Sequence, residues 1–100
     1  MIKHVVMWKL KDGAEGATRR DNALRMKALL DACAGQTPGM RSFEVGVDTG
    51  SDAAPWDVVL VAEFDDRAAL DVYQDHPIHQ AAKVFIAKVR ELRAAVDYEG

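Results

Sequence analysis

The chain has 100 residues, a length that predicts one domain over residues 1–100 with a single hydrophobic core. Hydrophobic residues make up 49% of it and charged residues 29%, as in ordinary globular proteins, and the formal net charge is −3. This charge gives no electrostatic basis for binding nucleic acid or an anionic membrane. No apolar run approaches the roughly 20 residues of a membrane span, and no secretory signal is recognisable, so we expect a cytoplasmic protein.

The first half of the chain predicts a strand, a long helix and a second strand. Residues 2–11 alternate as in a strand, residues 14–34 follow a helical period, and residues 40–47 alternate again. Gly35 would cap the helix at its C-terminal end. The expected inward-facing side chains are His4, Val6, Trp8 and Leu10 on the first strand, Asn22, Met26, Leu29, Leu30 and Cys33 on the helix, and Phe43, Val45 and Val47 on the second strand.

The second half predicts a loop, a strand, two helices and a last strand. Residues 48–55 predict the loop and residues 56–64 the strand, followed by helices over residues 67–74 and 77–89 and a strand over residues 93–99. The N-cap candidates for the two helices are Asp65 or Asp66 and then His76. The expected buried stripe of the last helix consists of Ile78, Ala81, Ala82, Phe85 and Val89.

The resulting order, β-α-β-β-α-α-β, is typical of a ferredoxin-like α+β fold, in which helices cover one face of an antiparallel sheet. The open face of such a sheet should be polar, but the first and third strands are apolar on both faces. Leaving Val5, Met7, Val59 and Val61 in water would forgo about 1.5–3 kcal/mol for each side chain. We therefore expect a homodimer in which two protomers pair their sheets.

The segment that reads Tyr-Gln-Asp-His-Pro-Ile-His is the main candidate for a functional site. It holds Tyr73 and two of the three histidines of the chain, His76 and His79. Because Pro77 suits a first helical position, His76 would cap the helix and His79 would lie in its first turn. Partial burial would lower the pKa of His79 and keep it neutral near pH 7, and Asp97 is the carboxylate expected to orient it. The residues alone leave open whether this is an acid–base site or a polar corner that locks two helices together.

Other kinds of site find less support in the sequence. Two histidines at i and i+3 could share a metal, but a cap residue and a first-turn residue chelate poorly, and no Cys or acidic residue is spaced to complete a zinc site. Neither a Gly-x-Ser-x-Gly elbow nor a phosphate-binding glycine loop is present. We therefore expect no metal and no cofactor. On the residues alone, His4 is interpreted as a hydrogen-bonded core histidine more readily than as a catalyst.

Six segments spread over the whole chain form a characteristic set: Met1-Ile2-Lys3-His4-Val5-Val6, Pro38-Gly39, Phe43-Glu44-Val45-Gly46, Glu63-Phe64-Asp65-Asp66-Arg67, Tyr73-x-x-His76-Pro77-x-His79 and Val96-Asp97-Tyr98. Together they resemble the stress-responsive A/B barrel (Dabb) domain family. The His-Pro-x-His block with its upstream tyrosine is the most specific of them. The resemblance implies a dimeric α+β barrel built from two ferredoxin-like protomers.

The same resemblance implies a chemistry for the candidate site. One plant member of the family, olivetolic acid cyclase, closes a linear polyketide by aldol condensation without a cofactor. By this resemblance His79 would be the general base that takes a proton α to a carbonyl, and Tyr73 would donate a hydrogen bond to the enolate oxygen. The expected substrate-binding side chains are His4, Val6, Trp8 and Leu60, and His76 and Asp97 would orient or support the site.

Three functions are therefore considered. The first is a cofactor-free lyase or cyclase that acts on a hydrophobic, polyketide-like carbonyl compound. The second is a stress-associated binding module that uses the same pocket, or only its dimer surface, without turnover. The third is a cofactor-free monooxygenase, as in other dimeric α+β barrels. The expected partner is a second copy of the chain, together with a small hydrophobic ligand wherever the pocket is used.

Overall fold

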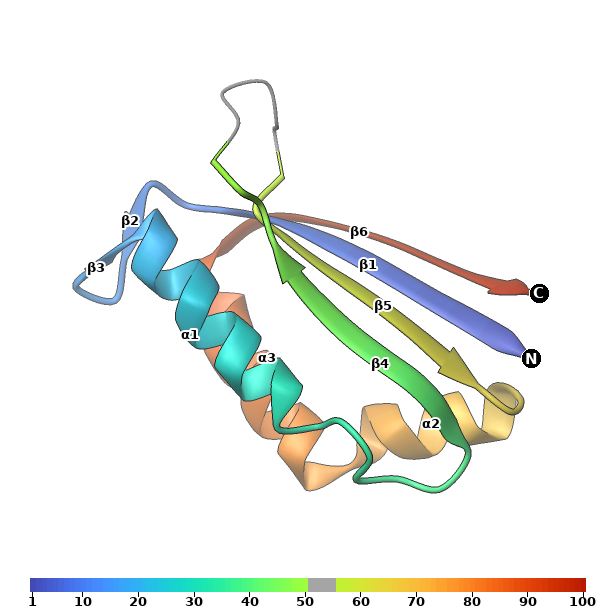
Figure 1. Ribbon diagram of the computed structural model, residues 1–100. Helices are drawn as coiled ribbons and strands as arrows, with labels where there is room; N and C mark the ends of the chain where they lie inside the picture. The colour runs from blue at the N-terminus through green and yellow to red at the C-terminus, as the bar shows by residue number, and fades with distance from the viewer. Residues whose placement is uncertain (51–55) are drawn as a thin grey trace.

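The computed structural model describes residues 1–50 and 56–100 and contains a four-stranded antiparallel sheet with helices on one face (Figure 1). In chain order the elements are β1 (Ile2–Leu10), β2 (Gly13–Ala14), β3 (Ala17–Thr18), α1 (Arg19–Asp31), β4 (Met40–Val47), β5 (Val58–Phe64), α2 (Arg67–Asp75), α3 (Pro77–Val89) and β6 (Arg90–Glu99). The strand order in the main sheet is β4-β5-β1-β6, and β2 pairs with β3 in a separate hairpin. This is the ferredoxin-like α+β fold that the sequence predicts, with the hairpin added.

The hydrophobic core lies between the sheet and the three helices, which Figure 1 shows on one side of the sheet. Strand alternation sends every second side chain of the two central strands, β1 and β5, into this layer. None of the helices in the described part of the chain is long and apolar enough to cross a membrane. The buried side chains of the central strands are those that the alternation predicts: His4, Val6, Trp8 and Leu10 on β1, and Val58, Leu60, Ala62 and Phe64 on β5.

The register of the sheet decides which side chains meet on the helix-covered face. On β1, His4 lies opposite Asp97 of β6, and Trp8 lies opposite Arg93 of the same strand. Directly opposed residues in an antiparallel ladder share one face of the sheet. Asp97 and Arg93 are therefore on the side of the sheet that the helices cover, next to His4 and Trp8.

The start of α1 differs from the prediction. The β2–β3 hairpin occupies the first residues of the range 14–34, for which the sequence pattern predicts a helix. Glu15 and Gly16 have φ values of 51° and 72°, so they form the two-residue turn with two positive φ angles that joins tight β-hairpins. The helix then begins after Thr18, whose hydroxyl accepts a hydrogen bond of 3.1 Å from the amide of Asp21. α1 therefore starts at Arg19, five residues after the predicted start at residue 14.

Other details of the prediction are also wrong. α1 ends at Asp31, before Gly35, because the chain tightens there into a turn in which the Cys33 amide donates to the Leu30 carbonyl at 2.9 Å. On α3, Ala81 is exposed and Ile86 is buried in its place. β5 starts two residues later than predicted and β6 three residues earlier. In the predicted loop, residues 51–55 lie outside the described residues.

The face of the sheet opposite the helices has an apolar centre that is uncovered in the protomer, with the charged Lys3, Glu44 and Glu63 around it. Val5 of β1 lies opposite Val61 of β5 and Val96 of β6, and Met7 lies opposite Val59. Val61 and Val96 are 40% and 55% exposed. The doubly apolar strands that the sequence predicts are therefore present, and their outer side chains form one continuous patch. We call this patch the open sheet face; its residues are Val5, Met7, Val59, Val61 and Val96.

Candidate functional site

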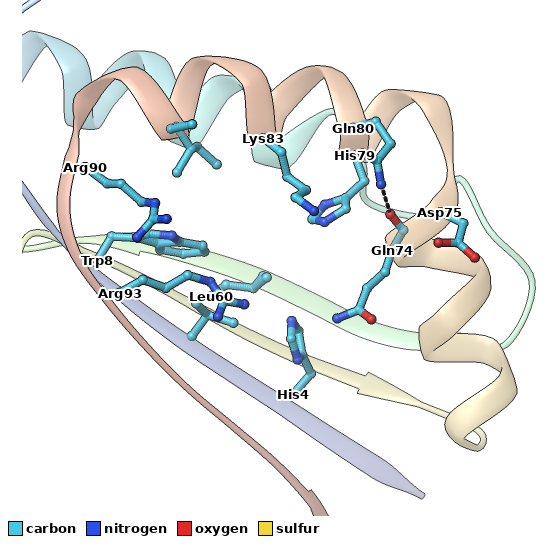
Figure 2. Close-up of a pocket in the computed structure, with 13 residues that line it drawn as sticks. His4, Trp8, Leu60, Gln74, Asp75, His79, Gln80, Lys83, Arg90 and Arg93 are labelled. Carbon is cyan, nitrogen blue, oxygen red and sulfur yellow. Dashed lines mark hydrogen bonds between the residues drawn. The ribbon is translucent and has the colours of Figure 1, made fainter.

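A cavity of about 500 Å³ lies between the sheet and the α2–α3 helix pair (Figure 2). His4, Val6, Trp8 and Leu60, the four side chains that the sequence predicts for substrate binding, line its sheet side. His79 lines it from the helix side. The cavity also includes polar and charged side chains from α2, α3 and β6, among them Gln74, Asp75, Lys83, Arg90 and Arg93.

Asp97 holds His4, and not His79 as the sequence reasoning expects. The Nδ1 atom of His4 forms a hydrogen bond with Oδ1 of Asp97, because the β1–β6 register places the two residues opposite each other. The second carboxylate oxygen of Asp97 lies 3.3 Å from Nη1 of Arg67 on α2. With its Nδ1–H donated to Asp97, a neutral His4 keeps the lone pair of Nε2 as an acceptor. His4 is thus both a hydrogen-bonded core histidine and part of the cavity wall.

His76 has a structural position outside the cavity lining. It is the N-cap of α3, and its Nδ1 atom accepts a hydrogen bond of 3.1 Å from the amide of Ile78. Pro77 follows at the first helical position, as predicted, and Asp66 caps α2 in the same way by accepting from the Ala69 amide at 2.9 Å. The polar corner between the two helices is therefore formed by His76, whereas His79 is available to the cavity.

Tyr73 lies behind His79 and does not line the cavity. Its side chain is fully buried, and its ring centroid is 4.5 Å from that of His79 and 5.4 Å from that of Phe64. The Tyr73 hydroxyl and Nδ1 of His79 are both buried without a hydrogen-bond partner among the described residues. Burial raises the pKa of Tyr73, and the Cys33 thiol would act in the same direction once ionised, so the Tyr73 hydroxyl stays protonated and can only act as a donor or a neutral acceptor.

His79 is held in its neutral form by its surroundings. Partial burial lowers the pKa of His79 to about 4, and the charges of Lys83, His4 and Arg93 act in the same direction. Desolvation disfavours the charged imidazolium, and neighbouring cations repel it. The two histidines of the cavity therefore have opposite electrostatic partners, because a carboxylate faces His4 and cations face His79.

The low pKa of His79 makes folding stability depend on pH. An unfolded chain binds a proton at its histidines near pH 6.5, whereas the folded chain resists protonation of His79 down to about pH 4. The contribution of His79 to stability should therefore be fully present above pH 6.5 and be lost as the pH falls from 6.5 through 4. The His79→Gln variant lacks this pH-dependent contribution. Between pH 7 and pH 4.5, the free energy of unfolding of the variant, measured in urea, should therefore fall less than that of the wild type. Parallel losses in both proteins would contradict the assigned pKa.

The sequence analysis does not include three basic residues of the cavity, Lys83, Arg90 and Arg93, among the site residues. For two of them the sequence pattern indicates the correct position. Arg93 precedes Asp97 by four residues on one strand, so alternation places both on the same face. Lys83 follows His79 by four residues on α3, a spacing that puts two side chains on one side of a helix. Arg90 lies at the junction of α3 and β6, where neither periodicity applies.

The structure offers no cluster for a metal ion in the described ranges. Among residues 1–50 and 56–100, no three His, Cys, Asp or Glu side chains come close enough to hold one. Cys33 is buried, and burial raises the pKa of its thiol, so the reactive thiolate form is disfavoured. The chemistry of the cavity therefore has to be sought in its histidines and charged side chains.

Known proteins resemble this chain over its whole length. The family model described as the stress responsive A/B barrel domain (Dabb) matches residues 2–100. An uncharacterized protein of Streptomyces coelicolor is 33% identical, over 99% of each chain. The crystal structure of a dimeric protein of unknown function with a ferredoxin-like fold, from Bacteroides fragilis, is 31% identical, with a TM-score of 0.85 over 99% of this chain and 95% of that one.

A solved structure of an antibiotic biosynthesis monooxygenase has the same fold. It is 22% identical to this chain, with a TM-score of 0.74 over 100% of this chain and 98% of that one. At this identity the likeness shows the fold alone. The match of the family model and the identity to the Streptomyces protein, in contrast, extend over nearly every residue. The chain therefore belongs to the stress responsive A/B barrel (Dabb) domain family.

Proposed function

We propose that the protein binds a small carbonyl compound in its cavity and carries out cofactor-free acid–base chemistry on it, the central step of a lyase or cyclase reaction. The observation that carries this proposal is that His4 and His79, two histidines with opposite electrostatic partners, line one cavity. The indole of Trp8 and the side chain of Leu60 offer an apolar surface for the body of the ligand. Catalytic sites commonly use two titratable groups whose environments differ in this way.

In the proposed step, His79 takes a proton from the carbon next to the carbonyl group. The electron pair of the broken C–H bond moves to the carbonyl oxygen, which becomes an enolate. His4 would serve this oxygen in its doubly protonated form, in which Nδ1–H is donated to Asp97 and Nε2–H is free to donate a hydrogen bond to the oxygen as it gains charge. The role implied for Tyr73 by the family resemblance, donation to the enolate, stays a prediction. Its ring, packed against that of His79, also supports a positioning role.

Exchange of α-protons for deuterium tests the proposed step directly. 2-Acetylnaphthalene, a flat neutral methyl ketone, is incubated with the protein in D₂O, and loss of its methyl signal is followed by NMR. The wild type should accelerate exchange, and His79→Gln should reduce the protein-dependent rate by about 10²–10⁴-fold. Tyr73→Phe should cause a loss of similar size if the hydroxyl contacts the enolate, and a much smaller loss if Tyr73 only positions His79.

His76→Asn is the matched control, since it removes a histidine outside the cavity while asparagine remains a good N-cap. Its exchange rate should equal that of the wild type. Exchange by the wild type no faster than that of imidazole at the same concentration would contradict the catalytic proposal. Binding of the ketone without exchange would then favour the non-catalytic binding module.

We also propose that the protein is a homodimer paired through the open sheet face. This face is apolar, although it is exposed in the protomer, and large exposed apolar patches are typical of protein interfaces. The similar Bacteroides fragilis protein is described as dimeric. A two-fold axis at the centre of the face would bring each patch against its copy, as isologous interfaces require.

A further inference from the structure

Three cations of the cavity have no acidic partner in the described part of the chain. Several basic side chains elsewhere form ion pairs, as Arg67 does with Asp97 and Asp71, although Lys3, Lys11, Arg20 and Arg25 form none between described residues. Lys83, Arg90 and Arg93 take part in none of the ion pairs between described residues. Three basic side chains left unpaired in one cavity are notable in a chain whose formal net charge is −3.

Two of the three unpaired cations lie at one end of the cavity, and the third lies between that end and His79. Figure 2 shows Arg90 and Arg93 gathered near Trp8, with Lys83 beside His79 toward the middle. Asp75 is the one acidic side chain among the described lining residues, and it lies at the opposite end. The charge of the cavity is therefore polarised, with a basic end around an aromatic surface. A ligand that is only apolar leaves this basic end without a counter-charge.

We infer that the ligand of this cavity carries a carboxylate, bound by Arg90, Arg93 and Lys83, beside a flat apolar body that lies on Trp8. Guanidinium groups bind carboxylates through paired hydrogen bonds, and the three side chains are exposed, so a ligand can reach them. This inference rests on the proposed function and narrows its substrate class to anionic aromatic or polyketide-like carbonyl compounds. With the carboxylate at the basic end, the reactive carbonyl reaches toward His79.

A bound carboxylate would also change the basicity of His79. The side chains that face His79 are Lys83 of its own helix, His4 of β1, Arg93 of β6 and Tyr73 of α2. Lys83 and Arg93 lower the pKa of His79, and a carboxylate bound to them would offset both charges. The pKa of His79 should then rise toward its ordinary value of about 6.5, closer to the working pH of an efficient general base. The ligand would thereby activate the base that acts on it.

Binding of 2-naphthoate and of the neutral 2-naphthamide separates the carboxylate from the apolar body. Dissociation constants are measured by NMR from the indole N–H signal of Trp8, with Trp56, which is outside this cavity, as an internal reference. 2-Naphthoate should bind about 10- to 100-fold more tightly than 2-naphthamide. Arg93→Gln should remove most of this preference. Arg20→Gln, which deletes an equal charge on α1 away from the cavity, should keep it.

The titration of His79 supplies a readout that does not depend on affinity. The pKa of His79 should rise when 2-naphthoate saturates the wild type. It should also rise in the ligand-free Arg93→Gln variant, whose lost charge lowers it, and stay unchanged in ligand-free Arg90→Gln. Equal affinities for the two naphthalene compounds, or a Trp8 signal that responds to neither, would overturn the carboxylate inference. The proposed function would be judged independently, since the exchange assay uses a neutral ketone.

Discussion

Replacing Val59 by lysine should convert the protein from a dimer into a monomer. Val59 lies on the open sheet face, between Met7 of β1 and Gly46 of β4. A charged side chain without a partner at the centre of an interface costs at least about 2 kcal/mol, and the symmetry of a homodimer applies that cost twice. The dissociation constant of the dimer should therefore increase about 1,000-fold, which sedimentation equilibrium over a range of concentrations would measure.

Val84→Lys is the control for this experiment. Val84 is on α3 and is 62% exposed, so it receives the same substitution on the helix-covered side of the molecule. This variant should remain dimeric with the stability of the wild type. If Val59→Lys sedimented like the wild type and kept its free energy of unfolding, the open sheet face would not be the interface.

Gly39→Ala should destabilise the fold by about 2–5 kcal/mol. Gly39 has a φ of 80°, a conformation that costs an L-residue roughly 1–2 kcal/mol. An added Cβ would also lie 2.6 Å from the Cβ of Ala69 on α2, an overlap that typically costs about 1–3 kcal/mol to relieve. Urea unfolding would measure the loss. Because α2 carries Tyr73, relief of the overlap should also disturb the packing of that ring against His79.

Gly35→Ala separates the two causes. Gly35 has a φ of 72°, but a Cβ there would have no atom within 4 Å. This variant should lose only the roughly 1–2 kcal/mol of backbone strain. Equal losses in Gly35→Ala and Gly39→Ala would mean that α2 can move away from the turn at no cost, and that the turn does not fix the position of this helix.

The architecture could be predicted from sequence because burial imposes a period on each strand and helix. The alternation of β1 and β5 gave their inward faces correctly, and the apolar residues on their outer faces predicted the open sheet face. The sequence does not predict the β2–β3 hairpin, because its turn, Glu15-Gly16, lacks the asparagine or aspartate that marks most such turns. The Thr18-x-x-Asp21 spacing was the available signal for the later helix start.

The candidate site was only partly predictable, because periodicity assigns a side chain to a face but not to a neighbour. Strand alternation predicts that Asp97 faces inward. Its hydrogen bond to His4 depends on the β1–β6 register, which cannot be predicted from the sequence. The burial of Tyr73 behind His79 also depends on how α2 and α3 pack together. Arg93 shares a face with Asp97 and could have been found by the same alternation.

The hydrogen bond between His4 and Asp97 joins residues 93 positions apart in the chain. Contacts of such long sequence separation carry a large loop-closure cost and form late when a chain folds. The hydrogen bond between His4 and Asp97 can therefore form only after β6 has paired with β1. A nascent or partly folded chain holds the same histidines without this pair, so the cavity gains its proposed chemistry only when the molecule is complete.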